Sequence, residues 1–128
     1  MSVVRVLVVD DQEPFRNAMS AVVEATDGFE VVGAVASGEE SVTAAEDLGP
    51  DLVLMDVNLP GINGLDATRQ ILSGAAGSGA VVVLLLSTYE DDEYEPRAAE
   101  CGAAAYIPKA VFGPDRLESA WAAATGAA

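Results

Sequence analysis

Five short apolar runs, each continuous rather than alternating with polar residues, constrain this chain more than any other feature. Strands buried on both faces have this pattern, because helices cover each side of their sheet. Between the runs, apolar residues recur at helical spacing, as in Phe15, Met19, Val22 and Val23. Strands alternating with helices predict an α/β fold with one parallel sheet and right-handed crossovers. The runs are Val3–Val9, Glu30–Ala36, Asp51–Met55, Ala80–Leu86 and Ala103–Ile107.

Residues that begin or end helices lie between the runs. Pro14 suits the first turn of a first helix, and Ser37 or Gly38 can begin the second, which Gly49-Pro50 ends. Three more helices are predicted: one with Leu65, Thr68 and Leu72, one over Glu90–Cys101 ended by Gly102, and one with Pro114 near its start that carries Leu117, Ala120, Trp121 and Ala124. The acidic residues 90–93 are interpreted as a solvated helix start rather than a second site.

Charge and composition exclude several function classes. The 128 residues suit one domain, 1–128, and carry 21 acidic against 6 basic side chains, a formal net charge of −15. This charge repels nucleic acid and anionic lipid, so we expect binding to neither. The apolar runs are far shorter than the roughly 20 residues that span a bilayer. Cys101 is the only cysteine, which suits the cytoplasm.

Histidine is absent from the sequence. Its absence excludes histidine-based metal sites, Ser-His-Asp and Cys-His catalysis, and a phosphohistidine relay within this chain. The chemistry must therefore use carboxylates, hydroxyls, the one thiol and Lys109, which is the only lysine.

Polar residues follow the predicted strands at their carboxyl ends. In a doubly wound sheet, ligands bind at these ends, at the point where the strand order reverses. If the first and third strands are neighbours there, three carboxylates converge, with two hydroxyls and one lysine at the same edge. The residues are Asp10 and Asp11 after the first run, Asp56 after the third, Ser87 and Thr88 after the fourth, and Lys109 after the fifth.

Clustered carboxylates repel one another unless a cation compensates their charge. Mg²⁺ accepts oxygen ligands and keeps several waters, so it suits such a cluster. A carboxylate beside Mg²⁺ can attack a phosphoryl group and form an aspartyl phosphate, with a lysine and a hydroxyl on the phosphoryl oxygens. Replacing Asp10 and Asp11 with alanine is expected to abolish the Mg²⁺-dependent perturbation of Trp121 or Tyr106 signals and, by relieving repulsion, to raise stability.

Four segments resemble the receiver domain of two-component response regulators, and their local sequence is similar to the NarL/FixJ-type subfamily. The resemblance implies a CheY-like (flavodoxin-like) fold, a doubly wound five-stranded parallel sheet in the order 2-1-3-4-5 with five helices. It also implies a sensor histidine kinase as partner. A homodimer and a C-terminal helix-turn-helix DNA-binding domain outside this chain are further candidates. The segments are Val6–Asp11, Asp51–Gly64, Leu84–Tyr89 and Gly102–Lys109.

The resemblance implies a role for each strand-end residue. Asp56 is the expected phosphoacceptor and Lys109 the conserved cation. Ser87 stands where threonine is commoner, Thr88 where alanine is frequent, and Ala110 where many receivers have proline. The expected Mg²⁺ ligands are Asp10, Asp11, Asp56 and the backbone carbonyl of Asn58, and the expected switch residues are Ser87, Thr88 and Tyr106.

Each residue also has a simpler structural interpretation. Asp10-Asp11 could cap the first helix, Tyr106 could be ordinary packing, and Lys109 could be a solvated cation. Asp56 could belong to a strand-to-turn exit before Pro60-Gly61, and Ser87-Thr88 could cap a helix. Their joint placement favours the site.

Two other functions stay open. The chain could be a pseudo-receiver that only binds partners, although the intact acidic residues argue against it. It could be a phosphohydrolase with an aspartyl intermediate, but Asn58 cannot be the general acid expected two residues after the nucleophile. A receiver that takes up a phosphoryl group slowly as a signal is not expected to be a conventional enzyme.

Overall fold

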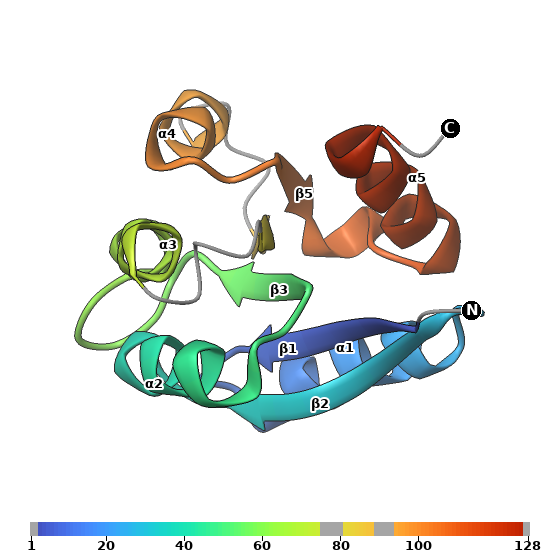
Figure 1. The fold of residues 1–128 in the computed structure, drawn as a ribbon, viewed down its shortest axis with the longest axis horizontal. Helices are drawn as coiled ribbons and strands as arrows, with labels where there is room; N and C mark the ends of the chain where they lie inside the picture. The colour runs from blue at the N-terminus through green and yellow to red at the C-terminus, as the bar shows by residue number, and fades with distance from the viewer. Residues whose placement is uncertain (1–2, 75–80, 89–93, 127–128) are drawn as a thin grey trace.

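The computed structural model describes residues 3–74, 81–88 and 94–126 of the chain. Within them, strands and α-helices alternate from β1 to α5, with a short 3-10 helix, η2, before α5 (Figure 1). The strands are β1 (Val4–Val9), β2 (Phe29–Val35), β3 (Leu52–Asp56), β4 (Val82–Ser87) and β5 (Ala105–Pro108). The helices are α1 (Glu13–Glu24), α2 (Gly38–Leu48), α3 (Gly64–Ser73), α4 (Tyr94–Cys101), η2 (Lys109–Val111) and α5 (Pro114–Thr125).

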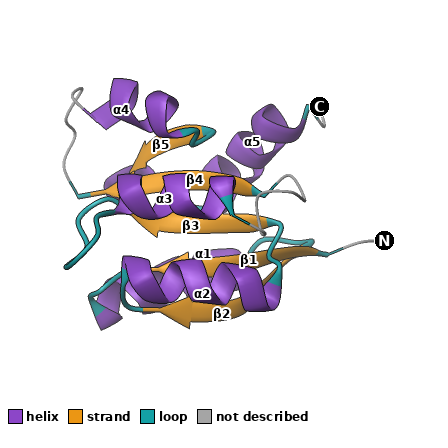
Figure 2. Ribbon diagram, turned by 60° about the vertical axis from the view of Figure 1, so that its left-hand side comes forward, coloured by secondary structure: helices purple, strands orange, loops and turns teal. Residues whose placement is uncertain are grey.

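The strands form one parallel sheet in the order β2-β1-β3-β4-β5, which confirms the predicted fold class (Figure 2). The strand order reverses between β1 and β3, so their carboxyl ends lie side by side. In the register of this pair, Val9 faces Met55. Asp10 follows Val9 and Asp56 follows Met55, so two of the predicted site residues lie together where the strand order reverses.

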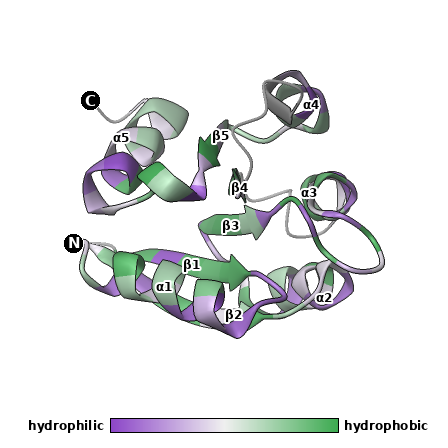
Figure 3. Ribbon diagram, turned by 180° about the vertical axis from the view of Figure 1, so that it is seen from behind, coloured by the Kyte–Doolittle hydropathy of each residue, from purple (hydrophilic) through white to green (hydrophobic). Residues whose placement is uncertain are grey.

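Two hydrophobic cores lie on opposite faces of the sheet. Alternate residues of each strand point to opposite faces, so Val6 and Val8 pack with α1 and α5, while Leu7 and Val9 pack with α2, α3 and α4. Figure 3 shows β3 and most of β1 as hydrophobic ribbons, whereas β2 and the helices have mixed character. The continuous apolar runs of the sequence therefore have their predicted cause, because both faces of each central strand are covered.

Capping residues fix the second helix where the sequence predicted it. The Ser37 hydroxyl accepts a hydrogen bond from the Glu40 backbone N–H at 3.1 Å and begins α2. Gly49 ends α2 in the left-handed conformation, with φ of +58°, which favours glycine. Pro14 lies in the first turn of α1, also as predicted.

Several boundaries differ from the sequence-based prediction. Asp56 and Ser87 are the last residues of β3 and β4, because strand pairing continues through them. Helix α4 is described from Tyr94, so the predicted helix start at Glu90 and the acidic residues 90–93 lie outside the described residues. No helix in the described ranges is long and apolar enough to cross a membrane.

Candidate functional site

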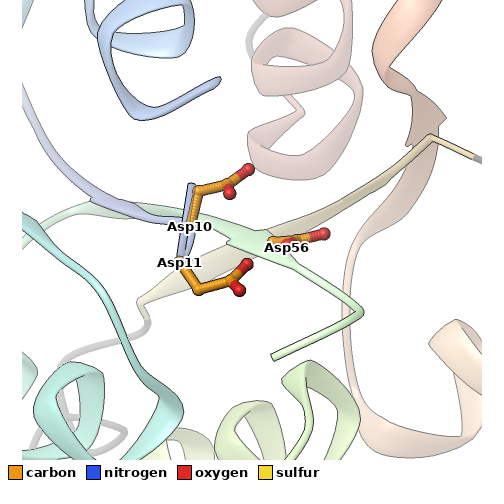
Figure 4. Close-up of side chains that lie close together, drawn as sticks. All are labelled: Asp10, Asp11 and Asp56. Atoms are coloured by element: carbon orange, nitrogen blue, oxygen red, sulfur yellow. The ribbon is translucent and has the colours of Figure 1, made fainter. Parts of the chain in front are cut away.

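Three carboxylates meet at the carboxyl ends of β1 and β3. Asp10, Asp11 and Asp56 each offer an oxygen, and these oxygens lie within 4.8 Å of one another. Figure 4 shows the side chains extending from the two strand ends into the same space. Asp10 is fully buried and Asp56 is 4% exposed, whereas Asp11 is exposed. The cluster therefore has two carboxylates inside the protein and one at the opening to solvent.

Asp10 is held by several polar contacts. Its Oδ1 accepts a hydrogen bond from the backbone N–H of Gln12 at 2.9 Å, and its Oδ2 accepts one from Nζ of Lys109 at 2.5 Å. Its backbone carbonyl accepts Nη1 of Arg16 at 2.9 Å. The N-cap of α1 is Gln12, without a side-chain cap hydrogen bond. Neither Asp10 nor Asp11 is therefore the cap of this helix, and that alternative interpretation is wrong.

Lys109 connects the end of β5 to the carboxylates. Nζ of Lys109 also lies 3.5 Å from Oδ1 of Asp56, and its side chain is only 9% exposed. The ring of Phe15 contacts the same ammonium, with 4.1 Å between Nζ and the ring centroid. Lys109 is therefore a buried member of the site, and its interpretation as a solvated surface cation is wrong.

The environment of Asp56 raises the pKa of its carboxyl group to about 6. Burial is the main cause, and the negative charge of Asp10 adds to it, because both disfavour the ionised form of Asp56. Lys109 and the backbone N–H of Asn58, which lies 3.3 Å from Oδ1 of Asp56, act in the opposite direction. One ammonium does not offset three carboxylates, so the cluster keeps an excess of negative charge.

The donor set suits a hard divalent cation. Carboxylate oxygens are the ligands that Mg²⁺ prefers, and the exposed Asp11 leaves room for the waters that Mg²⁺ retains. A bound divalent cation would also lower the pKa of Asp56, because its charge compensates the neighbouring carboxylates and favours the ionised form.

The hydroxyl residues occupy different environments. Ser87 is fully buried at the end of β4, where Leu86 faces Asp56 and Ser87 faces Pro108 in the strand register. Thr88 is exposed and lines a cavity of about 330 Å³ with Lys109. Ser87 is therefore an inner residue of the strand-end edge, and Thr88 an outer one.

Tyr106 lies on β5, half buried, and packs against the core on the side of α2, α3 and α4. Its interpretation as a packing residue is therefore compatible with the structure, and its role as a switch stays a prediction. Its neighbour Ile107 is buried in the opposite core.

Sequence reasoning gave no site role to Phe15, Arg16 and Gly64. A Cβ added at Gly64 would lie 2.1 Å from the backbone oxygen of Asp56, so only glycine permits this approach. Gly64 belongs to the resembling segment Asp51–Gly64, and that position was its only signal. Phe15 was predicted to face the core and Arg16 had no signal, because contacts with residues far along the chain leave no local pattern.

The response regulator receiver domain family matches residues 6–122 of the chain. The chain belongs to this family. It is thus a receiver domain of the kind found in two-component systems, as the strand-end motifs indicated.

This receiver domain is similar to several regulators and to solved receiver structures. It is 42% identical over 106 residues to the response regulator GacA of Pseudomonas viridiflava, covering 83% of this chain and 48% of GacA. It is 35% identical over 121 residues to the nitrate/nitrite response regulator protein NarL of Escherichia coli, covering 94% and 55%. The response regulator domain of Thermotoga maritima CheB superposes with a TM-score of 0.82 at 30% identity, covering 96% and 97%. The chain spans about half the length of the regulators GacA and NarL.

Proposed function

We propose that this receiver domain accepts a phosphoryl group on Asp56 in a Mg²⁺-dependent reaction and acts as a signalling switch. One observation carries the proposal: Asp56 ends β3 beside the carboxylates of Asp10 and Asp11, and the ammonium of Lys109 lies 3.5 Å from its Oδ1. Such an arrangement provides a nucleophile, oxygen ligands for a metal and a cation for the phosphoryl oxygens in one small space.

The transfer is a displacement at phosphorus. An oxygen of deprotonated Asp56 forms a bond to phosphorus, and the bond from phosphorus to the donor breaks, with its electron pair leaving on the donor. A nitrogen of a kinase phosphohistidine or an oxygen of acetyl phosphate is the leaving atom. Asp10, Asp11, Asp56 and the backbone carbonyl of Asn58 would hold Mg²⁺. When bound, the metal neutralises charge that builds up on the phosphoryl oxygens.

We propose that Lys109 and Ser87 bind the phosphoryl group and couple its presence to a conformational change. The ammonium of Lys109 already lies 3.5 Å from Asp56, and Ser87 ends the neighbouring strand. If both bind phosphoryl oxygens, they draw the ends of β4 and β5 inward and shift Thr88 and Tyr106. A phosphoryl group that makes contacts in only one of two states shifts the population toward that state. The face formed by α4, β5 and α5 would then change.

The partners and the wider setting follow from the family resemblance. We propose a sensor histidine kinase as the donor and transcriptional regulation as the output, as in the NarL/FixJ-type subfamily. A homodimer and a helix-turn-helix DNA-binding domain are candidates for the output, and the relatives' greater length supports a further domain. We also propose that residues 1–128 form one receiver domain and that the protein is located in the cytoplasm. We do not class the domain as a conventional enzyme.

The pseudo-receiver alternative predicts a chain that binds partners without phosphorylation. It has less support, because the carboxylates and the lysine lie together rather than apart. The phosphohydrolase alternative lacks a general acid at Asn58.

The test is incubation of the domain with Mg²⁺ and acetyl phosphate, followed by intact-mass measurement. One acid-stable, base-labile phosphoryl group is expected on the wild-type chain. Asp56→Asn should accept none, because an amide is not a nucleophile, and the matched surface change Asp47→Asn should accept one. Single-site labelling of Asp56→Asn at the wild-type rate would contradict the proposal.

A further inference from the structure

The ring of Phe15 is an uncharged neighbour of the Lys109 ammonium, whose charged contacts are Asp10 and Asp56. Phe15 lies on α1, four positions after Asp11, so the first turn of this helix brings the ring to the acidic cluster. Nζ of Lys109 lies 4.1 Å from the ring centroid, while Asp10 and Asp56 provide the charged contacts. A cation over an aromatic face is attracted by the ring quadrupole, and more strongly where water is excluded.

Core packing does not explain the position of Phe15. The helical pattern predicted that Phe15 would face the core with Met19 and Val23. Met19 and Val23 are buried there, but Phe15 is half buried and belongs to neither core of the described residues. Its ring instead lines the cavity of about 330 Å³ that also contains Lys109 and Phe112. The ammonium is therefore a specific partner of this ring at the edge of that cavity.

Asp10 is required for two purposes in the proposed reaction. It now binds Lys109 at 2.5 Å, and it would also be a ligand of Mg²⁺. A divalent cation competes with the ammonium for the oxygens of Asp10 and repels it. The ring of Phe15 attracts the ammonium whether or not the metal is bound, because its own charge distribution does not change.

We propose that Phe15 is a positioning residue, which holds the Lys109 ammonium beside Asp56 when a divalent cation occupies Asp10. The ammonium then stays within reach of a phosphoryl group instead of being displaced toward solvent. This inference rests on the proposed phosphorylation of Asp56 for its purpose, but the contact itself is testable without a phosphoryl donor.

Lys109 is the only lysine in the chain, so selective lysine labelling gives a single NMR signal set. Its ε-methylene protons should be shifted upfield by the ring current of Phe15 and should stay shifted at saturating Mg²⁺. Phe15→Leu should abolish this shift, and Phe15→Tyr, which keeps the ring face, should retain it. With acetyl phosphate and Mg²⁺, Phe15→Leu should accept the phosphoryl group roughly threefold to tenfold more slowly, and Phe15→Tyr near the wild-type rate.

Phe112→Leu is the matched control, because Phe112 lines the same cavity and its ring makes no described contact with the Lys109 ammonium. It should leave the Lys109 shift and the rate unchanged, and equal slowing by both leucine variants would overturn the proposal. Melting curves check folding, and Phe15→Met replaces Phe15→Leu if the latter unfolds. Loss of the wild-type ring-current shift at saturating Mg²⁺ would also overturn it. If the wild-type chain accepts no phosphoryl group, the proposed function fails, and the Mg²⁺ titration alone decides whether Phe15 holds Lys109.

Discussion

Nζ of Lys109 lies 2.5 Å from Oδ2 of Asp10, although 99 positions separate the two residues. Asp10 is fully buried and the Lys109 side chain is 9% exposed, so this ion pair is inside the protein. It joins the end of β1 to the end of β5 across the carboxyl edge of the sheet, and it sets the expectations for several variants.

Removing Asp10 should destabilise the domain in the absence of metal. The sequence alone led us to expect that alanine at Asp10 and Asp11 would relieve repulsion and raise stability. The structure revises this for Asp10, because Asp10→Ala leaves a buried ammonium with one partner fewer. We expect a loss of about 1–3 kcal/mol in the free energy of unfolding, measured by urea denaturation with a chelator. The exposed Asp11→Ala should change it little or raise it slightly, and a stabilised Asp10→Ala would show that the ion pair contributes nothing.

Asp56 should make the stability of the metal-free domain fall as pH rises. Its folded pKa of about 6 is above the ordinary value of 3.8, so between these values the folded state binds more protons than the unfolded state. The penalty of ionising Asp56 is absent below about pH 4 and is fully present above about pH 6. Asp56→Asn lacks this penalty, so its stability relative to wild type should increase through that window by about 1–3 kcal/mol. Urea denaturation of both chains at several pH values measures this, and a constant difference would contradict it.

Mg²⁺ binding should be visible at two backbone amides. The N–H groups of Gln12 and Asn58 donate to the carboxylates of Asp10 and Asp56, so a metal on those carboxylates should shift both signals in a titration. Trp121 is a poorer reporter than the sequence suggested, because its ring contacts Phe29 at the start of β2, away from the site. The shifts should disappear when Asp10 and Asp11 are both replaced by alanine.

The exposed change Asp27→Ala is the control for this titration and should preserve both shifts. Unchanged Mg²⁺ affinity without Asp10 and Asp11 would show that these carboxylates do not bind the metal.

The switch role of Ser87 and Lys109 should be separable from the acceptance of a phosphoryl group on Asp56. Ser87→Ala and Lys109→Ala are expected to accept a phosphoryl group on Asp56 more slowly and to lose its effect on Tyr106, since each removes a contact to the phosphoryl oxygens. The ring NMR signals of Tyr106 before and after acetyl phosphate measure the effect. The control Thr43→Ala changes an exposed hydroxyl on α2, away from the site, and should keep the response. A full wild-type shift in both Ser87→Ala and Lys109→Ala would refute their switch role.

Gly64 should tolerate no side chain without moving Asp56. Alanine there would place a Cβ 2.1 Å from the backbone oxygen of Asp56, too close unless the loop between β3 and α3 shifts. Gly64→Ala should therefore lower both the free energy of unfolding, by about 1–3 kcal/mol, and the rate of phosphate acceptance. The control Gly28→Ala tests glycine loss at a position with positive φ where an added Cβ meets nothing, so it should lower stability but not the rate in the folded protein. A normal rate in Gly64→Ala would show that the loop accommodates the change.

The sequence by itself determined the elements and their order. Apolar runs such as Val6–Val9 predict strands because both faces of a central strand are covered. Ser37 and Gly49 predict the ends of α2 because capping residues act within one turn of the helix. The strand-end acidic residues were also predictable, since in a parallel sheet successive carboxyl ends meet at one edge.

Only the tertiary structure decided how those residues are used. The burial of Asp10, its ion pair with Lys109 and the ring of Phe15 beneath the ammonium depend on how β1, β5 and α1 pack together. The same helical spacing that buries Met19 places Phe15 at the edge of the core, where a lysine from the other end of the chain decides its contact. Local patterns record neighbours within a few residues, whereas charge compensation in a buried site depends on distances that exist only after the sheet has formed.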